Sequence, residues 1–174
     1  MIGRSGAPIN AIAEGVDIQV VVGQPPDSTF VGRHLGRATW VLAASPAYLD
    51  RMGRPSSPAD LAAHQCLRLL GTTPQREWSL VDVHGHEVTV PVGGTFEADD
   101  SRALGDAAYE GLGVCVRPLG ECVAAARTGM LERVLPDYSF QPLDVYALLP
   151  PGRLQLRRVE VCVEALRASL AALA

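Results

Sequence analysis

The order of apolar and polar positions along the chain predicts alternating strands and helices. A β-branched run over residues 16–22 has few polar interruptions, which favours a central strand buried on both faces of a parallel sheet. Residues 30–35 lead into a second expected strand over residues 38–44, and the apolar run at residues 143–149 predicts another. The last segment predicts an amphipathic helix over residues 154–173, because apolar residues recur at spacings of three and four: Leu156, Val159, Val163, Leu166, Leu170 and Leu173.

Capping residues divide the first half of the chain. Ser45 and Pro46 predict a helix start, with Ser45 as the N-cap and Pro46 at the first helical position. Residues 57–64 predict a second short helix, and residues 67–70 predict the strand that follows it. Short helices and strands therefore alternate here, as they do in α/β proteins.

A hairpin is expected where two alternating segments, residues 78–80 and 87–92, flank an X-Gly turn at residues 83–86. His84 and His86 lie in this turn and raise the question of a metal site. No third ligand follows at metal-ligand spacing, so solvated turn residues are favoured over metal ligands.

One complete βαβ unit is expected over residues 94–118. Residues 95–97 suit a short strand, Asp99 and Asp100 suit a helix N-cap, and residues 114–116 suit a buried second strand. A parallel pair joined by a helix places the strand ends and the helix N-terminus at one edge of the sheet, where open α/β folds bind small molecules. This unit is therefore expected to form half of a ligand cleft.

Residues 119–130 predict a further helix with Val123, Ala126 and Met130 on its inner face, followed by a short strand over residues 131–135. An early strand that crosses out of the first part of the chain, and a late strand that returns to it, predict two lobes. Two-lobed α/β proteins bind ligands between their lobes, so a small-molecule site is expected there.

Composition narrows the class of protein. The chain has 174 residues, of which 48% are apolar, and it can bury a substantial core. Its net charge is −4, so it is a poor candidate for binding nucleic acid by itself. No secretory signal or membrane span is visible, which favours a cytoplasmic protein with no membrane contact.

The cysteines predict buried free thiols. Cys66, Cys115, Cys122 and Cys162 are widely spaced and form no C-x-x-C motif, so neither a metal site nor another cofactor site is expected. Cys115 and Cys162 lie in apolar runs and are expected in the core. A redox-active pair is the less favoured alternative.

No catalytic constellation is visible, and the chain is therefore expected not to be an enzyme. The sequence contains no G-x-S-x-G, G-x-G-x-x-G or P-loop motif. Asp99 and Asp100 are adjacent at a helix start, where capping explains them better than paired acid/base chemistry.

A series of motifs in this order resembles the C-terminal effector-binding domain of LysR-type transcriptional regulators. The resemblance covers nearly everything from about residue 10 onward. The matching segments are AEGVDIQVVVG (13–23), VLAASPAYL (41–49), SSPADLAAHQCL (56–67), EADDSRALGDAAYEGLGVCVRP (97–118) and LDVYALLPP (143–151).

The resemblance implies a two-lobed α/β fold of the periplasmic-binding-protein-like type (type II), with lobe I incomplete. Residues 1–45 would supply part of lobe I and the first crossing, residues 46–142 would form lobe II, and residues 143–174 would return to lobe I with a strand and the C-terminal helix. The family's winged helix-turn-helix, and the first strand, helix and second strand of lobe I, would precede this chain.

In this family a small-molecule effector binds between the lobes and controls transcription through a dimer or tetramer on promoter DNA. The resemblance therefore implies DNA binding only through the missing helix-turn-helix domain. A stand-alone solute-binding protein of similar fold is the alternative function.

Family positions carried over one at a time suggest eight effector-binding residues: Gly23, Ser45, Thr72, Thr73, Asp99, Asp100, Ser101 and Arg117. Many relatives have an apolar residue where Arg117 stands, so Arg117 either supplies a charge for an anionic effector or is a solvated rim residue. The charge of the effector is open. Carboxylates that point into the cleft would favour a hydroxylated or amine-bearing ligand, and carboxylates that only cap the helix would leave its amides for an anion.

Overall fold

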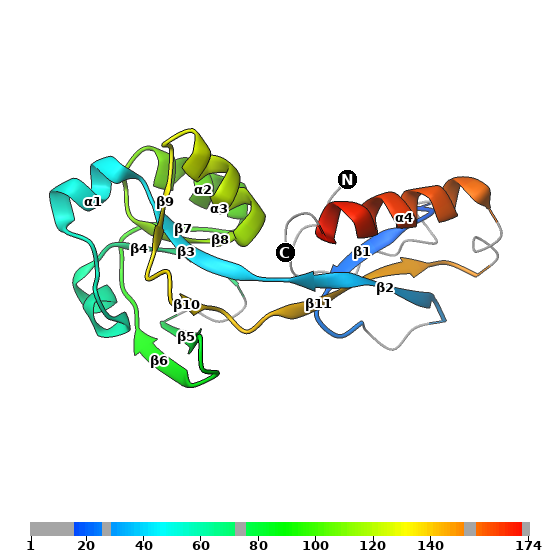
Figure 1. Cartoon of the computed structure of the whole chain (residues 1–174), viewed down its shortest axis with the longest axis horizontal. Coiled ribbons are helices and arrows are strands. Elements are labelled where there is room, and N and C mark those ends of the chain that lie inside the picture. The colour runs from blue at the N-terminus through cyan, green and yellow to red at the C-terminus, as the bar shows by residue number, and fades with distance from the viewer. Residues whose placement is uncertain (1–15, 26–28, 72–75, 152–155, 172–174) are drawn as a thin grey trace. The chain divides into compact units, whose positions relative to one another are not determined.

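The computed structural model describes residues 16–25, 29–71, 76–151 and 156–171. The chain divides into two compact units (Figure 1). The first unit combines Met1–Ala38 with Pro142–Ala174, and the second unit is Thr39–Gln141. The strand Trp40–Ala44, which the sequence analysis grouped with residues 1–45, thus lies in the second unit. Within the described ranges, no helix is long and apolar enough to cross a membrane.

The first unit is a three-stranded antiparallel sheet with one helix on a face (Figure 1). Strand β11 (Leu143–Leu149) lies between β1 (Gln19–Val22) and β2 (Val31–Ala38), and helix α4 (Arg157–Ala171) packs on the sheet. The core between sheet and helix consists of Leu35, Val145, Ala147, Leu149, Val159 and Val163.

The expectation of a central parallel strand at residues 16–22 is wrong. Strand β1 pairs antiparallel with β11, and β11 is its one partner among the described strands. Val20 and Val22 are 43% and 49% exposed, because α4 packs mainly on β2. A β-branched run indicates a strand, but the direction of its neighbour depends on a segment 120 residues later in the chain.

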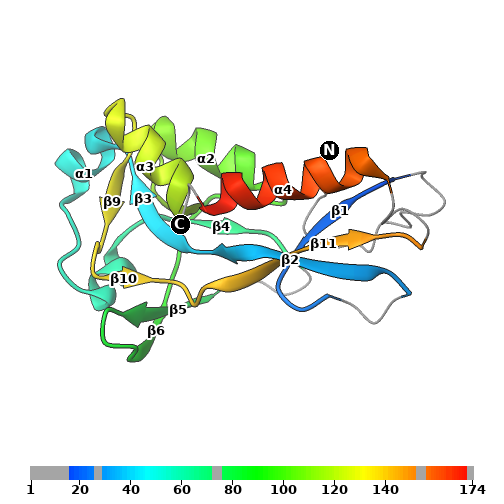
Figure 2. The ribbon, with the colours of Figure 1, turned by 45° about the vertical axis from the view of Figure 1, so that its right-hand side comes forward.

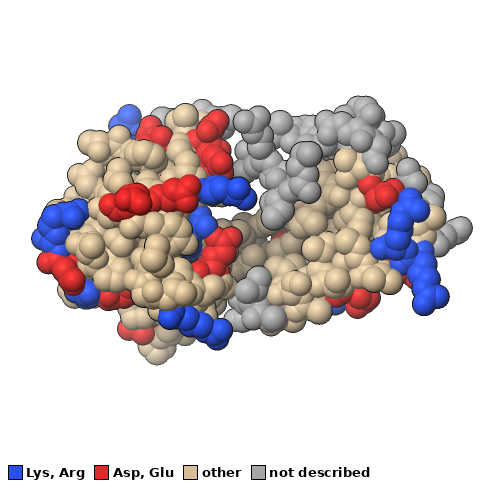
Figure 3. Space-filling model, turned by 90° about the horizontal axis from the view of Figure 1, so that it is seen from above, with Lys and Arg blue, Asp and Glu red and all other residues tan. Residues whose placement is uncertain are grey.

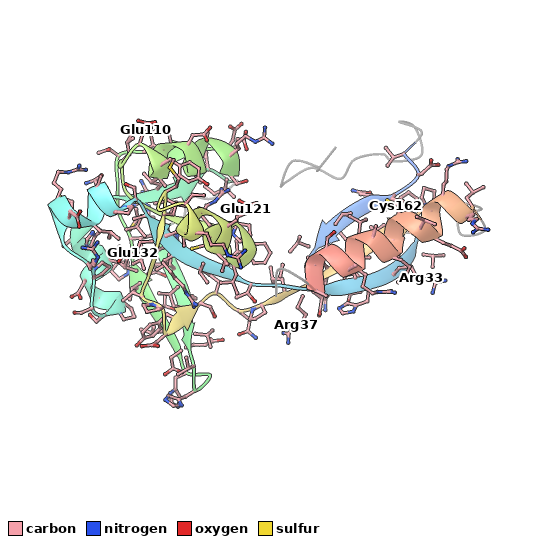
Figure 4. All side chains as sticks on the ribbon, turned by 45° about the horizontal axis from the view of Figure 1, so that its top comes forward. Arg33, Arg37, Glu110, Glu121, Glu132 and Cys162 are labelled. Atoms are coloured by element: carbon pink, nitrogen blue, oxygen red, sulfur yellow. The ribbon has the colours of Figure 1, made fainter. Side chains whose placement is uncertain are left out.

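The predicted inner face of the C-terminal helix is confirmed. Leu156, Leu166 and Leu170 pack against the core of the first unit beside the two buried valines of α4. Residues 154–155 and 172–173 of the predicted helix lie outside the described residues. Cys162 is exposed on α4 (Figure 4), so the expectation that it is in the core is wrong.

A five-stranded mixed sheet forms the centre of the second unit, in the order β7-β4-β8-β3-β9. Its strands are β3 (Trp40–Ala44), β4 (Cys66–Leu69), β7 (Glu97–Ala98), β8 (Val114–Pro118) and β9 (Glu132–Val134). Strand β4 is parallel to both β7 and β8, whereas β3 is antiparallel to β8 and β9. The predicted βαβ unit is present as β7, α2 (Ser101–Tyr109) and β8, but β4 is inserted between its two strands.

Two layers cover this sheet. Helices α2 and α3 (Leu119–Arg127) lie on one side, over a core that includes Val41, Leu67 and Cys115 (Figure 2). A second core lies on the opposite side of the sheet. It is covered by the hairpin of β5 (Glu77–Asp82) and β6 (Glu87–Pro91), by helix α1 (Pro46–Met52) and by the 3₁₀ helix η1 (Pro58–Ala63). Strand β10 (Tyr138–Ser139), which has no clear signal in the sequence, extends the hairpin by pairing with β5.

The local predictions in the second unit are largely confirmed. Ser45 caps α1, and the X-Gly turn joins β5 to β6 with Gly85 at a φ of 85°. Residues 57–64 form the predicted short helix, which has 3₁₀ geometry. Residues 30–44, expected to contain one strand, form β2 and β3, and these lie in different units.

The predicted inner face of the helix at residues 119–130 is wrong. Val123 and Met130 are 44% and 50% exposed, while Cys122 and Ala125 are buried. Helix α3 carries apolar residues on several sides, so its periodicity does not specify which face is buried.

Candidate functional site

The carboxyl ends of three parallel strands meet at one edge of the second unit's sheet. Leu69 of β4 pairs with Ala98 of β7, and the Leu70 amide donates to the Ala98 carbonyl at 2.7 Å. The segment that follows β7 is Asp99–Ser101, which therefore begins beside the end of β4. In open α/β sheets, ligands bind at this carboxyl edge.

The start of α2 presents one carboxylate that caps the helix and one that does not. The Asp100 carboxylate accepts from the Arg102 amide at 2.9 Å and serves as the N-cap. Asp99 and Ser101 are exposed, and their side chains form no hydrogen bond with another described residue. The expected capping role thus belongs to Asp100, and Asp99 is left available to a ligand.

Arg117, the last residue before Pro118 in β8, is held by contacts within the unit. Its Nη1 donates to the Ser101 carbonyl at 2.7 Å, and its Nη2 pairs with the Glu121 carboxylate on α3. The Arg117 side chain is 11% exposed, so it is not a solvated rim residue. The geometry brings Arg117 to the same sheet edge as Asp99–Ser101, although its guanidinium already has partners.

Ser45 lies at the opposite edge of the same sheet. Strand β3 runs antiparallel to β8, with Trp40 opposite Pro118 and Ala43 opposite Cys115. Ser45 is therefore near the first residue of β8, and the four residue steps of that strand separate the two edges by about 13 Å. The Ser45 hydroxyl accepts from the Tyr48 amide at 3.3 Å, as an N-cap does. Ser45 and Asp100 are not brought together.

The other predicted site residues belong to the first unit or lie outside the described residues. Gly23 belongs to the first unit, where its amide donates to the Asp144 carbonyl at 2.8 Å. Its φ of 87° is one that glycine adopts without strain. Thr72 and Thr73 lie outside the described residues, so their part in the site stays a prediction.

Two residues that shape the site, Gly105 and Glu121, were not predicted from the sequence. Glu121 holds one side of the Arg117 guanidinium, and Gly105 provides the space in which that guanidinium lies. A glycine inside a predicted helix was the available signal, because such a glycine is unfavourable unless packing requires it.

A buried hydrogen-bond chain lies on the other side of the sheet. The Tyr48 hydroxyl accepts from the Gln65 amide at 2.9 Å and lies 3.1 Å from Nδ1 of His64. The hydroxyl has one proton to donate, and Nδ1 is the one acceptor for it among the described residues, so the pairing favours a neutral imidazole with its proton on Nε2. Burial lowers the pKa of His64 below its usual value, and the nearby Asp60 opposes this only in part.

We expect the second unit to lose stability as the pH falls below about 6.5, the ordinary pKa of histidine. The unfolded chain then binds a proton that the folded His64 resists, so the loss continues until the folded pKa is reached. The variant His64→Asn keeps an acceptor for Tyr48 and removes the titration, so urea denaturation at pH 7.5 and 5.5 should give a smaller difference than in wild type. His84→Asn, at an exposed position of the turn between β5 and β6, is the control, and an unchanged pH dependence in His64→Asn would contradict this assignment.

The thiols of the core are unreactive in this setting. Burial raises the pKa of Cys66 to about 11 and that of Cys115 to about 12, and it also raises the pKa of Cys122. Thiolate is the reactive form, so these groups stay protonated near neutral pH. Among the described residues, no group of three or more His, Cys, Asp or Glu side chains is placed to hold a metal ion.

Similar sequences are found among known proteins. The family model described as LysR substrate binding domain matches residues 1–171. The transcriptional activator AaeR of Escherichia coli K12 is 32% identical over 155 residues, which are 89% of this chain and 50% of AaeR. The regulator YhjC of the same strain is 33% identical over 160 residues, 90% of this chain and 53% of YhjC.

Solved structures of regulators share the fold. CrgA of Neisseria meningitidis superimposes with a TM-score of 0.79 at 26% identity, covering 95% of this chain and 56% of CrgA. The regulatory domain of AphB from Vibrio vulnificus, treated with cumene hydroperoxide, gives a TM-score of 0.71 at 28% identity, covering 89% of this chain and 76% of that one.

The chain spans about half the length of the curated relatives it matches. The family match extends over nearly all of this chain, and the regulatory domains that resemble it have the two-lobed, periplasmic-binding-protein-like α/β fold. On these grounds, the chain belongs to the LysR substrate-binding-domain family.

Proposed function

We propose that this chain is the effector-binding and oligomerisation domain of a LysR-type transcriptional regulator. The observation that carries the proposal is the family match over residues 1–171, together with relatives that are named as transcriptional activators and regulators. The chain would act as a dimer or tetramer, and it would reach promoter DNA through a helix-turn-helix domain outside this sequence.

The charge of the chain supports a role in ligand sensing, with DNA binding by another domain. The net charge is −4, and arginines are interspersed with acidic side chains over the second unit on the face shown in Figure 3. DNA binding depends strongly on cationic contacts to phosphates. An acidic domain is therefore suited to sensing a ligand rather than to holding DNA.

Part of the effector site would lie at the carboxyl edge of β4, β7 and β8. Asp99 and Ser101 are exposed there without a hydrogen-bond partner among the described residues, while Arg117 is already paired. A free carboxylate and a hydroxyl accept hydrogen bonds from hydroxyl and amine groups. The edge therefore favours a hydroxylated or amine-bearing effector over a dicarboxylate.

Two other functions are less well supported. A stand-alone solute-binding protein is not favoured, because the relatives described above are regulators. The same relatives are named as transcriptional regulators rather than enzymes, so an enzymatic function is not favoured either.

Isothermal titration of the full-length regulator against a panel of hydroxylated and amine-bearing metabolites tests the function. Mass spectrometry of the same mixtures checks whether any ligand is consumed. We expect reversible binding without turnover. Turnover of a bound ligand, or binding by no member of the panel, would contradict the proposal.

The variant Asp99→Asn is expected to weaken binding of the identified ligand about tenfold, because it removes a charged acceptor from the edge. Asp106→Asn, at an exposed position within α2, should leave the affinity unchanged. Equal affinities for wild type, Asp99→Asn and Ser101→Ala would move the site elsewhere without refuting the regulatory function.

A further inference from the structure

Helix α2 contains a glycine in its middle, at Gly105, where glycine disfavours a helix. The packing explains it. A Cβ added at this position would lie 3.0 Å from Nη1 and 3.1 Å from Cζ of Arg117. The guanidinium thus lies in tight contact with the position that a Cβ at residue 105 would take.

The same guanidinium joins three elements of the second unit. It extends from the end of β8, donates to the carbonyl of Ser101 at the start of α2, and pairs with Glu121 in the first turn of α3. Its Nε is buried and has no hydrogen-bond partner among the described residues. The side chain is therefore held from two directions in a nearly solvent-free position.

Electrostatics alone would not place an arginine here. The N-terminus of a helix carries partial positive charge and favours anions, and Arg117 lies against the first turns of two helices. The Ser101 carbonyl and the Glu121 carboxylate offset this repulsion. The presence of an arginine here is therefore better explained by its effect on structure: its bond to Ser101 holds the first turn of α2 in place.

We propose that Arg117, seated against Gly105 and held by Glu121, is a positioning residue that fixes the first turn of α2 and the Asp99–Ser101 segment at its start. The inference rests on the proposed function only in assigning that segment to the effector site. The contacts that hold the turn do not depend on any ligand.

Hydrogen exchange of the full-length protein, followed by mass spectrometry, tests the positioning role. In Arg117→Leu, we expect the amides of the first turn of α2 to exchange at least tenfold faster, while those of the β5–β6 hairpin change less than twofold. Arg117→Lys should restore part of the protection, because an ammonium can donate to Ser101 but lacks the second arm for Glu121. Arg127→Leu, at an exposed arginine of α3, is the matched control and should change neither region.

Gly105→Ala provides the second measurement. In wild type the guanidinium, which Ser101 and Glu121 hold, would have to give way to the new methyl group by a few tenths of an ångström, so α2 should exchange faster. In the Arg117→Leu background the flexible leucine can yield, and the same alanine should slow exchange because alanine favours a helix. This reversal is specific to contact between the two residues.

Either of two outcomes would overturn the inference. One is exchange that rises equally in α2 and in the hairpin, which would indicate general destabilisation. The other is an effect of Gly105→Ala that is the same with and without Arg117. Neither measurement uses a ligand, so a failed ligand search would count against the proposed function alone.

Discussion

Replacing Gly113 with alanine is expected to destabilise the second unit by about 3 kcal/mol, at the upper end of what overpacking costs. An added Cβ would lie 2.2 Å from the carbonyl oxygen of Gln65 and 3.0 Å from its carbonyl carbon. These are backbone atoms, and the same carbonyl accepts from the Val114 amide at 2.8 Å. Relief of the clash would therefore separate β4 from β8 at the start of their pairing.

Tryptophan fluorescence during urea denaturation measures this effect, since both tryptophans, Trp40 and Trp78, belong to the second unit. Gly93→Ala is the matched control, because no atom lies within 4 Å of its added Cβ. We expect that variant to match wild type or to be slightly more stable. Similar stabilities of the Gly113 and Gly93 variants would show that the strands are less closely packed than described.

Replacing Tyr48 with alanine is expected to cost about 3–5 kcal/mol, the range for truncating a large buried aromatic residue. Tyr48 is 1% exposed and belongs to the larger core of the second unit. Its hydroxyl also connects α1 to the chain that enters β4, by accepting from the Gln65 amide and contacting His64. Tyr48→Phe keeps the ring and removes only these contacts, so it should cost about 1–3 kcal/mol.

Tyr109→Phe is the control for the hydroxyl, since the Tyr109 hydroxyl forms no hydrogen bond with a described residue. Urea denaturation of the three variants and wild type separates the contribution of the ring from that of the hydrogen bonds. A Tyr48→Phe protein as stable as wild type would show that water replaces the lost partner of Gln65, contrary to the burial of the site.

Local sequence signals predicted the elements that rest on neighbouring residues. Ser45 and Asp100 are N-caps because their side chains reach amides two or three positions later. The hairpin follows from its turn, and α4 follows from a single apolar stripe. The motifs, in their order along the chain, resemble those of a known family and so also indicated the family.

Long-range pairing was not predictable in the same way. The β-branched run at residues 19–22 does not specify that β11 is its neighbour, and residues 95–118 contain nothing that places β4 between β7 and β8. The apolar residues of α3 fit more than one rotation, and the structure buries Cys122 rather than Val123. Each of these choices depends on packing partners far away in the sequence.

By itself, the sequence determined the local elements and the acidic start of α2 at a sheet edge, because caps, turns and apolar stripes act over a few residues. The resemblance of its motifs indicated the family. Only the tertiary structure decided that Ser45 lies at the opposite edge from Asp100, and that Arg117 is enclosed rather than exposed. The reason is physical: the room for the guanidinium is made by Gly105, and its partner is Glu121, which become neighbours of Arg117 only when α2 and α3 pack on the sheet.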